Sequence, residues 1–138
     1  KIVVDSNPDV VNHNIETVRR LSKGFRDNAD YDRSLEVLSN VKKLNSKMLT
    51  KSGVMVGIGE TFEEITKVMD DLRSHSCDIL TIGQYLRPSM NHAEVKEYVT
   101  LKRFEEYKVL GKEKGFRYIA SGPLVRSSYQ AKKQFEGE

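Results

Sequence analysis

Hydrophobic positions along the chain follow two alternating patterns. Apolar residues at helical spacing, separated by charged residues, predict amphipathic helices. Short apolar runs bounded by glycine, proline or polar residues predict strands buried on both faces. The predicted helices cover residues 15–21, 31–44, 61 to at least 72, 100–114 and the terminus from about residue 127, and the predicted strands cover 9–12, 49–59, 78–86 and 116–120.

Individual residues mark where several helices begin and end. Thr61 followed by Glu64 has the form of a capping box, and Thr100 is placed to cap the helix after it. Gly24 and Gly115 are predicted to stop the helices that precede them. In the helix after Thr100, the residues expected to face inward are Leu101, Phe104, Tyr107 and Leu110.

Strands that alternate with helices predict an α/β fold with parallel pairing. The number of units suits half of an eight-unit (β/α) TIM-type barrel, and an open doubly wound sheet fits the same pattern. Residues 1–138 would then form one unit. Half a barrel would leave two sheet edges and an apolar inner face open, so we expect the chain to be a fragment.

Composition removes several classes of function. Charged residues make up 31% of the chain and the net charge is only +3, which gives no case for nucleic acid as the main partner. No segment approaches the roughly 20 apolar residues that a membrane span needs. Cys77 is the single cysteine, so it cannot form an intrachain disulfide or hold a cysteine-rich metal site alone. We interpret it as a buried structural thiol at the start of a strand.

Ligands of parallel α/β proteins bind at the carboxyl ends of the strands, where this chain places polar residues. The segment 12–14 suits a ribose or amino-acid group, or alternatively a helix cap. His13 is expected to be a structural hydrogen-bonding residue. The remaining strand-end residues are Glu16, Gly57, Gly59, Glu60, Thr61, Gly83, Gln84, Tyr85, Ser121, Gly122, Arg126, Ser127 and Ser128.

Residues 53–60 contain a glycine at each end of a buried strand. Glycine would let a flat ligand approach the backbone closely. A phosphate-binding loop is a rival interpretation, although Glu60 places negative charge where a phosphate would lie, and no Gly-Lys-Ser/Thr sequence follows. A simple strand–helix turn is the third interpretation of these residues. Serine-hydrolase chemistry has no support, because Ser127 and Ser128 lack a base partner and suit a helix cap.

Five segments together resemble the lipoyl synthase family of radical S-adenosylmethionine enzymes in order and spacing. They read NHNIET (12–17), TKSG (50–53), GIGET (57–61), LTIGQYL (80–86) and SGPLVRSSY (121–129). The resemblance extends from about residue 9 to 131 and implies the carboxyl-terminal half of a radical S-adenosylmethionine barrel.

The resemblance implies an activity that composition could not show. Enzymes of this family insert two sulfur atoms into an octanoyl chain attached to a lysine of a carrier protein. One [4Fe–4S] cluster cleaves S-adenosylmethionine to a 5′-deoxyadenosyl radical, and a second, auxiliary [4Fe–4S] cluster is the sulfur source. The implied partner is an octanoylated lipoyl-carrier domain, of an E2 subunit or the glycine-cleavage H protein, with neither nucleic acid nor membrane involved. The implied location is the cytoplasm in a bacterium, and a mitochondrion or plastid in a eukaryote.

Roles are carried over by position. Ser127 or Ser128 resembles the oxygen ligand of the auxiliary cluster and would be the catalytic and metal-binding residue, with Arg126 and Tyr129 orienting it. The segment 53–60 resembles the strand motif beside the adenine, with Gly53, Gly57 and Glu60 as its predicted cofactor-binding residues. The remaining cofactor contacts are Asn12, Asn14 and Glu16 for the ribose or methionine part and Gln84, Tyr85 and Leu86 for the adenine.

The chain departs from the family pattern in its cysteines. The Cys-x3-Cys-x2-Cys loop and a second cysteine trio are both absent, and we expect them to precede residue 1 in a longer protein. The chain alone should then be inactive. Two alternatives are a non-catalytic nucleoside-binding module and a phosphate-binding barrel enzyme. The latter would need Lys51 as a Schiff-base lysine, for which a salt-bridged structural role is the preferred interpretation.

Overall fold

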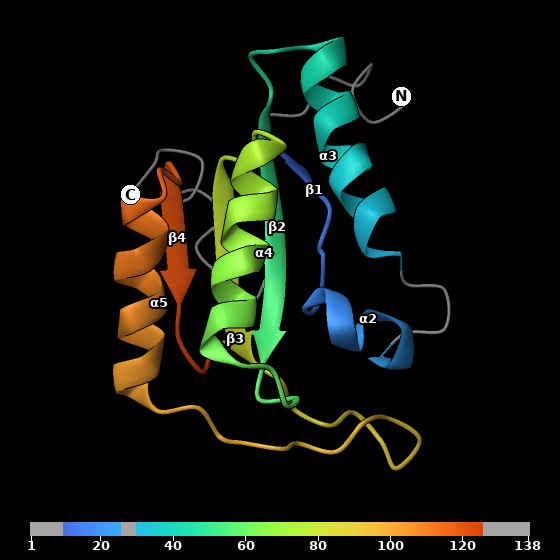
Figure 1. The fold of residues 1–138 in the computed structure, drawn as a ribbon, viewed down its shortest axis with the longest axis vertical. Helices are drawn as coiled ribbons and strands as arrows, with labels where there is room; N and C mark the ends of the chain where they lie inside the picture. Colours follow the sequence, from blue (N-terminus) through green and yellow to red (C-terminus); the bar gives the residue numbers. More distant parts are fainter. Residues whose placement is uncertain (1–9, 26–29, 126–138) are drawn as a thin grey trace.

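The computed structural model describes residues 10–25 and 30–125, and Figure 1 shows how their elements are arranged. Within these ranges the chain alternates between strands and helices, as the hydrophobic pattern predicts. The elements are β1 (Val10–Asn12), α2 (Arg19–Phe25), α3 (Tyr31–Leu44), β2 (Leu49–Val56), α4 (Phe62–Ser74), β3 (Ile79–Gln84), α5 (Leu101–Glu113) and β4 (Tyr118–Ser121).

The strands of the described residues form one parallel sheet in the order β1-β2-β3-β4. All four run in the same direction, so their carboxyl ends meet at one edge, at the bottom of Figure 1. The spatial order follows the sequence order without the reversal that defines an open doubly wound sheet. An α/β fold with parallel pairing is therefore confirmed, and the sheet lacks a topological switch point.

One face of the sheet packs against α3, α4 and α5. The strand residues of this core alternate with the glycines and polar residues of the opposite face, as the two-residue period of a strand requires. Buried apolar residues of the helices complete the core. Its members include Leu35 and Leu38 of α3, Ile65, Val68, Met69 and Leu72 of α4, Phe104 and Tyr107 of α5, and Val54, Val56, Leu80, Ile82 and Ile119 of the strands.

The helix caps hold the connections in place. At α4 the Glu64 amide donates to the Thr61 hydroxyl at 3.1 Å, and the Thr61 amide donates to the Glu64 carboxylate at 2.9 Å, so the predicted capping box is confirmed. Arg20 of α2 donates to both oxygens of the same carboxylate, at 2.9 and 2.8 Å. Arg20 thereby lowers the pKa of Glu64 and joins α2 to the start of α4. Thr100 caps α5 as predicted.

The helix predicted from residue 15 was placed too early. Ile15 and Glu16 continue along β2 instead: the Glu16 amide donates to the Gly53 carbonyl, and the Glu16 carbonyl accepts from the Met55 amide, both at 2.9 Å. Helix α2 begins only at Arg19 and includes Gly24, which was predicted to end it. Backbone pairing with a strand distant in sequence has overridden the local helical spacing.

Leu101 was also predicted wrongly to face inward, because 74% of its surface is exposed. The buried face of α5 consists of Phe104, Tyr107 and Gly111. A methyl group at Gly111 would overlap the Ile119 side chain of β4. With α5 this close to the sheet, Gly111 lies on the buried face and Leu101 does not. The predicted stop at Gly115 is confirmed by its positive φ of 96°, just after the last turn of α5.

Cys77 is fully buried ahead of β3, as predicted. Burial raises the pKa of its thiol to about 12, and the thiol donates to the Ile79 carbonyl at 3.3 Å. The next residue, Asp78, joins three elements by accepting from Lys42 of α3 at 2.6 Å and from the Thr50 amide of β2 at 2.9 Å. Cys77 therefore has the surroundings of a structural residue, with no feature that would activate a nucleophile.

Candidate functional site

A bulge after β1 shapes one wall of the site. From Val10 to Asn12 the strand pairs with β2 in a constant register, whereas the bridge of Glu16 to Val54 has moved by one residue. One extra residue is thus inserted between Asn12 and Glu16. The Ser52 hydroxyl accepts from the Ile15 amide at 3.0 Å, and Glu16 adopts a positive φ of 75°. Two backbone hydrogen bonds between Glu16 and β2 hold this left-handed conformation, which costs a non-glycine residue free energy.

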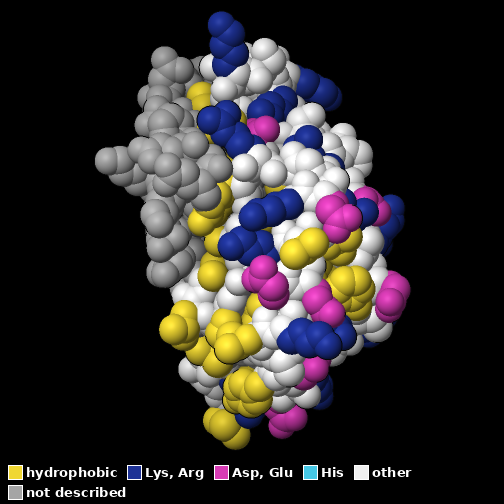
Figure 2. Space-filling view, turned by 90° about the vertical axis from the view of Figure 1, so that its left-hand side faces the viewer, with side chains coloured by type: hydrophobic (Ala, Val, Ile, Leu, Met, Phe, Trp, Pro, Cys, Tyr) yellow, Lys and Arg dark blue, Asp and Glu magenta, His cyan; other side chains and the backbone are white. Residues whose placement is uncertain are grey.

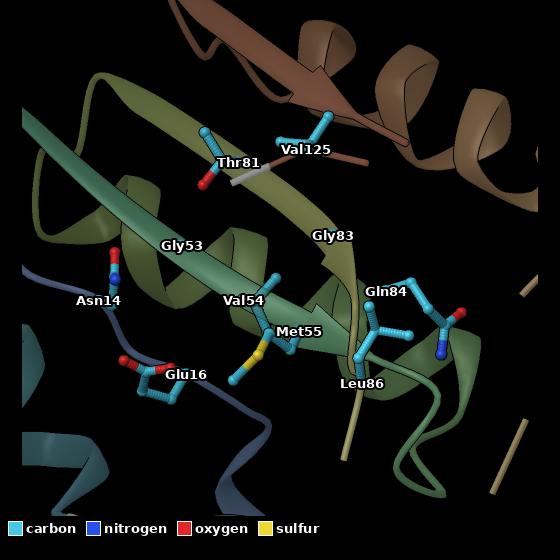
Figure 3. Close-up of a pocket in the computed structure, with 10 residues that line it drawn as sticks. All are labelled: Asn14, Glu16, Gly53, Val54, Met55, Thr81, Gly83, Gln84, Leu86 and Val125. Atoms are coloured by element: carbon cyan, nitrogen blue, oxygen red, sulfur yellow. The ribbon is translucent and has the colours of Figure 1, made fainter. Parts of the chain in front are cut away.

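A cavity of about 230 Å³ lies beside this bulge, on the sheet face opposite the helices. Alternate residues of the two central strands form its floor: Gly53 is in register with Thr81, and Met55 with Gly83. Figure 3 shows the lining residues and the segments that carry them. They are Asn14, Glu16, Gly53, Val54, Met55, Thr81, Gly83, Gln84, Leu86 and Val125.

Gly53 keeps the polar end of the cavity open. A Cβ atom at this position would lie 2.9 Å from both Asn14 Oδ1 and Thr81 Oγ1, which is closer than side chains tolerate. Asn14 Oδ1 is also fully buried and has no hydrogen-bond partner among the described residues. A buried acceptor without a donor is costly. The arrangement therefore favours a ligand that lies against Gly53 and donates a hydrogen bond to Asn14.

Away from this end the lining combines apolar side chains with the polar residues Glu16 and Gln84. Met55, Leu86 and Val125 contribute side chains without hydrogen-bonding hydrogens, and the two glycines of the floor expose flat backbone. A cavity lined by both apolar side chains and polar groups suits a small molecule that has both a planar ring and hydroxyl or ammonium groups. A nucleoside has this combination.

The structure brings together only some of the residues predicted for this site. Asn14, Glu16, Gly53, Gln84 and Leu86 line the cavity, whereas Asn12, Gly57, Glu60 and Tyr85 do not. Helix α2 begins at Arg19, so the interpretation of residues 12–14 as its cap is wrong. The His13 ring and the Ser34 hydroxyl form a hydrogen bond of 3.2 Å, which agrees with a structural role for His13.

Glu60 closes the turn between β2 and α4. Its carboxylate accepts from the Gly57 amide at 3.0 Å and from the Ile58 amide at 2.9 Å. These amides would otherwise point outward and could bind an anion. Because Glu60 already occupies them, a phosphate-binding loop is not formed here.

Gln84 reaches the cavity lining from the end of β3, but its amide points away from Asn14 and Glu16 (Figure 3). Along β3, Leu80 and Ile82 belong to the core on the helical side, and the two-residue period places Gln84 on that side as well. Its amide is hydrogen-bonded to the connection between β3 and α5.

Lys51, the candidate for Schiff-base chemistry, is 5% exposed, and burial lowers the pKa of its ammonium group. It does not line the cavity. Among the described residues, no group of three or more His, Cys, Asp and Glu side chains is positioned to hold a metal ion. Arg126, Ser127, Ser128 and Tyr129, which carry the cluster prediction, lie outside the described residues.

Sequence reasoning did not single out Val54, Met55, Thr81 and Val125, although the predicted segment 53–60 includes the first two. Met55 could have been found by counting two residues on from Gly53 within the same strand. Thr81 could not, because it becomes a neighbour of Gly53 only through the register of β2 and β3. Val125 approaches from beyond the end of β4, where no periodic pattern applies.

The surface near the carboxyl ends of the strands carries exposed apolar side chains, as the lower part of Figure 2 shows. Those with the largest exposure include Met90 and Tyr98 of the connection between β3 and α5, Leu101 at the start of α5, and Leu124. In the described residues, none of the helices is long and apolar enough to cross a membrane.

Comparison with curated proteins gives close relatives over almost the whole chain. It is 58% identical over 131 residues to a lipoyl synthase of Caldanaerobacter subterraneus subsp. tengcongensis, covering 95% of this chain and 46% of the relative. It is 57% identical to the lipoyl synthase of Flavobacterium psychrophilum, with coverages of 95% and 45%. With that of Rubrobacter xylanophilus it is 57% identical over 136 residues, with coverages of 99% and 42%. The chain thus spans less than half the length of these relatives. No protein-family model matches it.

Proposed function

We infer from the membership of this chain in the lipoyl synthase family that it is the carboxyl-terminal part of an enzyme that inserts two sulfur atoms into a protein-bound octanoyl group. The observation that carries the proposal is the agreement between two independent features. The chain is 52–58% identical to curated lipoyl synthases over nearly its full length, and its sheet has a cavity that suits a nucleoside.

The cavity would hold the adenosyl part of S-adenosylmethionine. Gly53 would lie against the ligand, and Asn14 would accept a hydrogen bond from a ribose hydroxyl or from the ammonium group. Met55 and Leu86 would cover apolar parts of the ligand and exclude water from them. When bound, S-adenosylmethionine supplies the hydrogen-abstracting chemistry of the reaction. The contribution of this chain is to bind the ligand and hold it in one orientation.

The described residues do not suit the iron–sulfur clusters. Cluster ligands are thiolates, and the one thiol in the chain is buried with a raised pKa. We therefore propose that cysteines in another part of a longer protein bind the clusters. From the resemblance of segment 121–129 to the family, we propose in addition that Ser127 or Ser128 supplies one oxygen ligand. Arg126 and Tyr129 would then orient the ligating serine. The 138 residues alone would be inactive.

The sheet would form half of a (β/α) barrel. Its strands follow one another in sequence order, and its helices pack on one face, as in a segment of a TIM-type barrel. The opposite face carries the cavity and would become the barrel interior. In this arrangement the substrate, an octanoylated lipoyl-carrier domain, would approach the carboxyl ends of the strands.

Alanine substitutions at the two serines test the proposed function in the complete protein that contains this chain. After anaerobic reconstitution, wild-type protein should convert an octanoylated carrier domain to the lipoylated form. Either Ser127→Ala or Ser128→Ala should lose sulfur insertion and about half of the bound iron and sulfide, because one of two clusters loses a ligand. Ser74→Ala, on α4, is the matched control and should behave as wild type. Unchanged iron and sulfide in both serine variants would contradict the ligand assignment. Absence of sulfur insertion by wild-type protein would contradict the function.

A further inference from the structure

Residues 85–100 connect β3 to α5 without any helix or strand. The connection passes along the carboxyl ends of the strands, at the bottom of Figure 1, and most of its residues are exposed. Connections of this length without secondary structure are uncommon, and many are functional. Its first exposed residue, Leu86, is also part of the cavity lining. The position of this connection therefore determines one wall of the candidate site.

The Gln84 side chain binds the connection at both ends. Its Nε2 group donates to the Tyr85 carbonyl at 3.0 Å and to the Glu97 carbonyl at 2.9 Å. Its Oε1 atom accepts from the Val99 amide at 2.9 Å. The side chain is 5% exposed. One buried amide thus joins the first residue of the connection to two residues near its end.

Gly57 supplies the second attachment. Its carbonyl accepts from the Lys96 amide at 2.8 Å and from the Glu97 amide at 3.2 Å. A methyl group at Gly57 would overlap both the Gln84 amide nitrogen and the Glu97 carbonyl, and the residue has a positive φ of 99°. Glycine is needed here because the Gln84 amide and the backbone of the connection both approach this residue.

Tyr85 supplies the third attachment, since its buried hydroxyl donates to the Ala93 carbonyl at 2.6 Å. Within the connection, Arg87 donates to the carbonyls of His92 and Met90 at 2.9 and 2.8 Å. An exposed segment is therefore held in one conformation by buried side chains at the end of β3 and by its own arginine.

We propose that Gln84 is a positioning residue, whose amide fixes the connection 85–100 and so holds Leu86 at the wall of the nucleoside cavity. Tyr85 and Gly57 assist by holding the same connection. The alternative is direct contact between the Gln84 amide and the ligand. Against it, both N–H groups of the amide are already used by backbone carbonyls, and the amide points away from Asn14 (Figure 3). The ligand-binding part of this proposal rests on the proposed function.

Gln84→Leu in the complete protein tests the proposal, because leucine has a similar volume and lacks all three hydrogen bonds. Backbone amide exchange at Lys96, Glu97 and Val99 should become at least about tenfold faster, since local opening of the connection costs less. The dissociation constant for S-adenosylmethionine, measured by calorimetry on anaerobically reconstituted protein, should rise about tenfold. Tyr31→Phe is the matched control: it removes a buried hydroxyl that donates to Asp71 at 2.8 Å, between α3 and α4. It should leave both quantities within about twofold of wild type.

Tyr85→Phe is a milder second variant that loses the hydrogen bond to Ala93 and keeps the aromatic ring. It should speed amide exchange at Lys96 about threefold and keep the fold intact even if Gln84→Leu does not fold. The double variant Tyr85→Phe with Gln84→Leu should weaken S-adenosylmethionine binding by less than the product of the two single effects, because both variants release the same segment. Independent destabilisation would give the full product.

The outcomes separate the parts of the proposal. Unchanged exchange at Lys96, Glu97 and Val99 in Gln84→Leu would overturn the attachment role. Faster exchange with an unchanged dissociation constant would overturn the positioning role. If wild-type protein does not bind S-adenosylmethionine, the proposed function and the positioning role both fail, whereas the exchange rates still decide whether Gln84 holds the connection.

Discussion

Gly53→Val in the complete protein should weaken binding of S-adenosylmethionine by about 100-fold, which corresponds to about 2.7 kcal/mol. The valine side chain would occupy the space between Asn14 and Thr81. Its Cβ atom alone would lie 2.9 Å from a side-chain oxygen of each residue. Valine is otherwise well suited to a central strand, so the fold should persist. Calorimetric titration of reconstituted protein measures the affinity, and circular dichroism checks the fold.

Gly122→Ala is the control for replacing a glycine near the sheet. A Cβ atom there would lie 3.6 Å from Val125, which is an ordinary contact, and Gly122 does not line the cavity. Its affinity should stay within about twofold of wild type. If Gly53→Val binds S-adenosylmethionine as tightly as wild type, the ligand lies elsewhere and the assignment of this cavity is wrong.

Leu80→Ala should reduce the free energy of unfolding by about 3 kcal/mol. Leu80 is fully buried in β3, and its side chain belongs to the core between the sheet and the helices. Removing three carbon atoms there leaves a cavity that rigid neighbours cannot refill. Urea unfolding of the complete protein, followed by circular dichroism, measures the change.

Val109→Ala on α5 is the control for loss of aliphatic volume, because 49% of the Val109 surface is exposed. Its cost should stay below about 0.5 kcal/mol. A loss of less than about 1 kcal/mol in Leu80→Ala would contradict the packing of β3 against the helices described above.

The local features of this fold could be predicted from the sequence. The bounds of α3 match the predicted range of 31–44, and the caps at Thr61 and Thr100 are confirmed. Each depends on residues within one or two turns of one another, so spacing along the chain contains the necessary information. The buried thiol of Cys77 was predictable for the same reason, since it lies two residues before the apolar start of β3.

Features set by distant residues could not be predicted in this way. Ile15 lies at helical spacing from Val18 and Leu21, but its amide donates to the Ser52 hydroxyl. The backbone groups of Glu16 bond to Gly53 and Met55 on β2. The polar end of the site joins Asn14, Gly53 and Thr81 from three segments, and only the sheet register brings them together. Strand β2 also ends earlier than predicted, at Val56, because Gly57 turns the chain and Glu60 binds the amides that follow.

Gln84 illustrates a prediction that the sequence could have refined. Resemblance to the family suggested a cofactor contact, whereas the period of β3 places its side chain with Leu80 and Ile82 on the helical face. Counting alternate residues from the apolar positions would have separated it from Thr81 and Gly83. Such counting gives the face of the sheet, but the partner in the connection 85–100 becomes visible only in three dimensions.

A crystal structure of the complete protein with bound S-adenosylmethionine is the most direct test of the central claim, that this cavity is a nucleoside site. We predict that the adenosyl group lies against Gly53, with the Asn14 amide oxygen accepting a hydrogen bond from the ligand. Electron density for the ligand at another location, with the space beside Gly53 filled by protein side chains, would contradict the account.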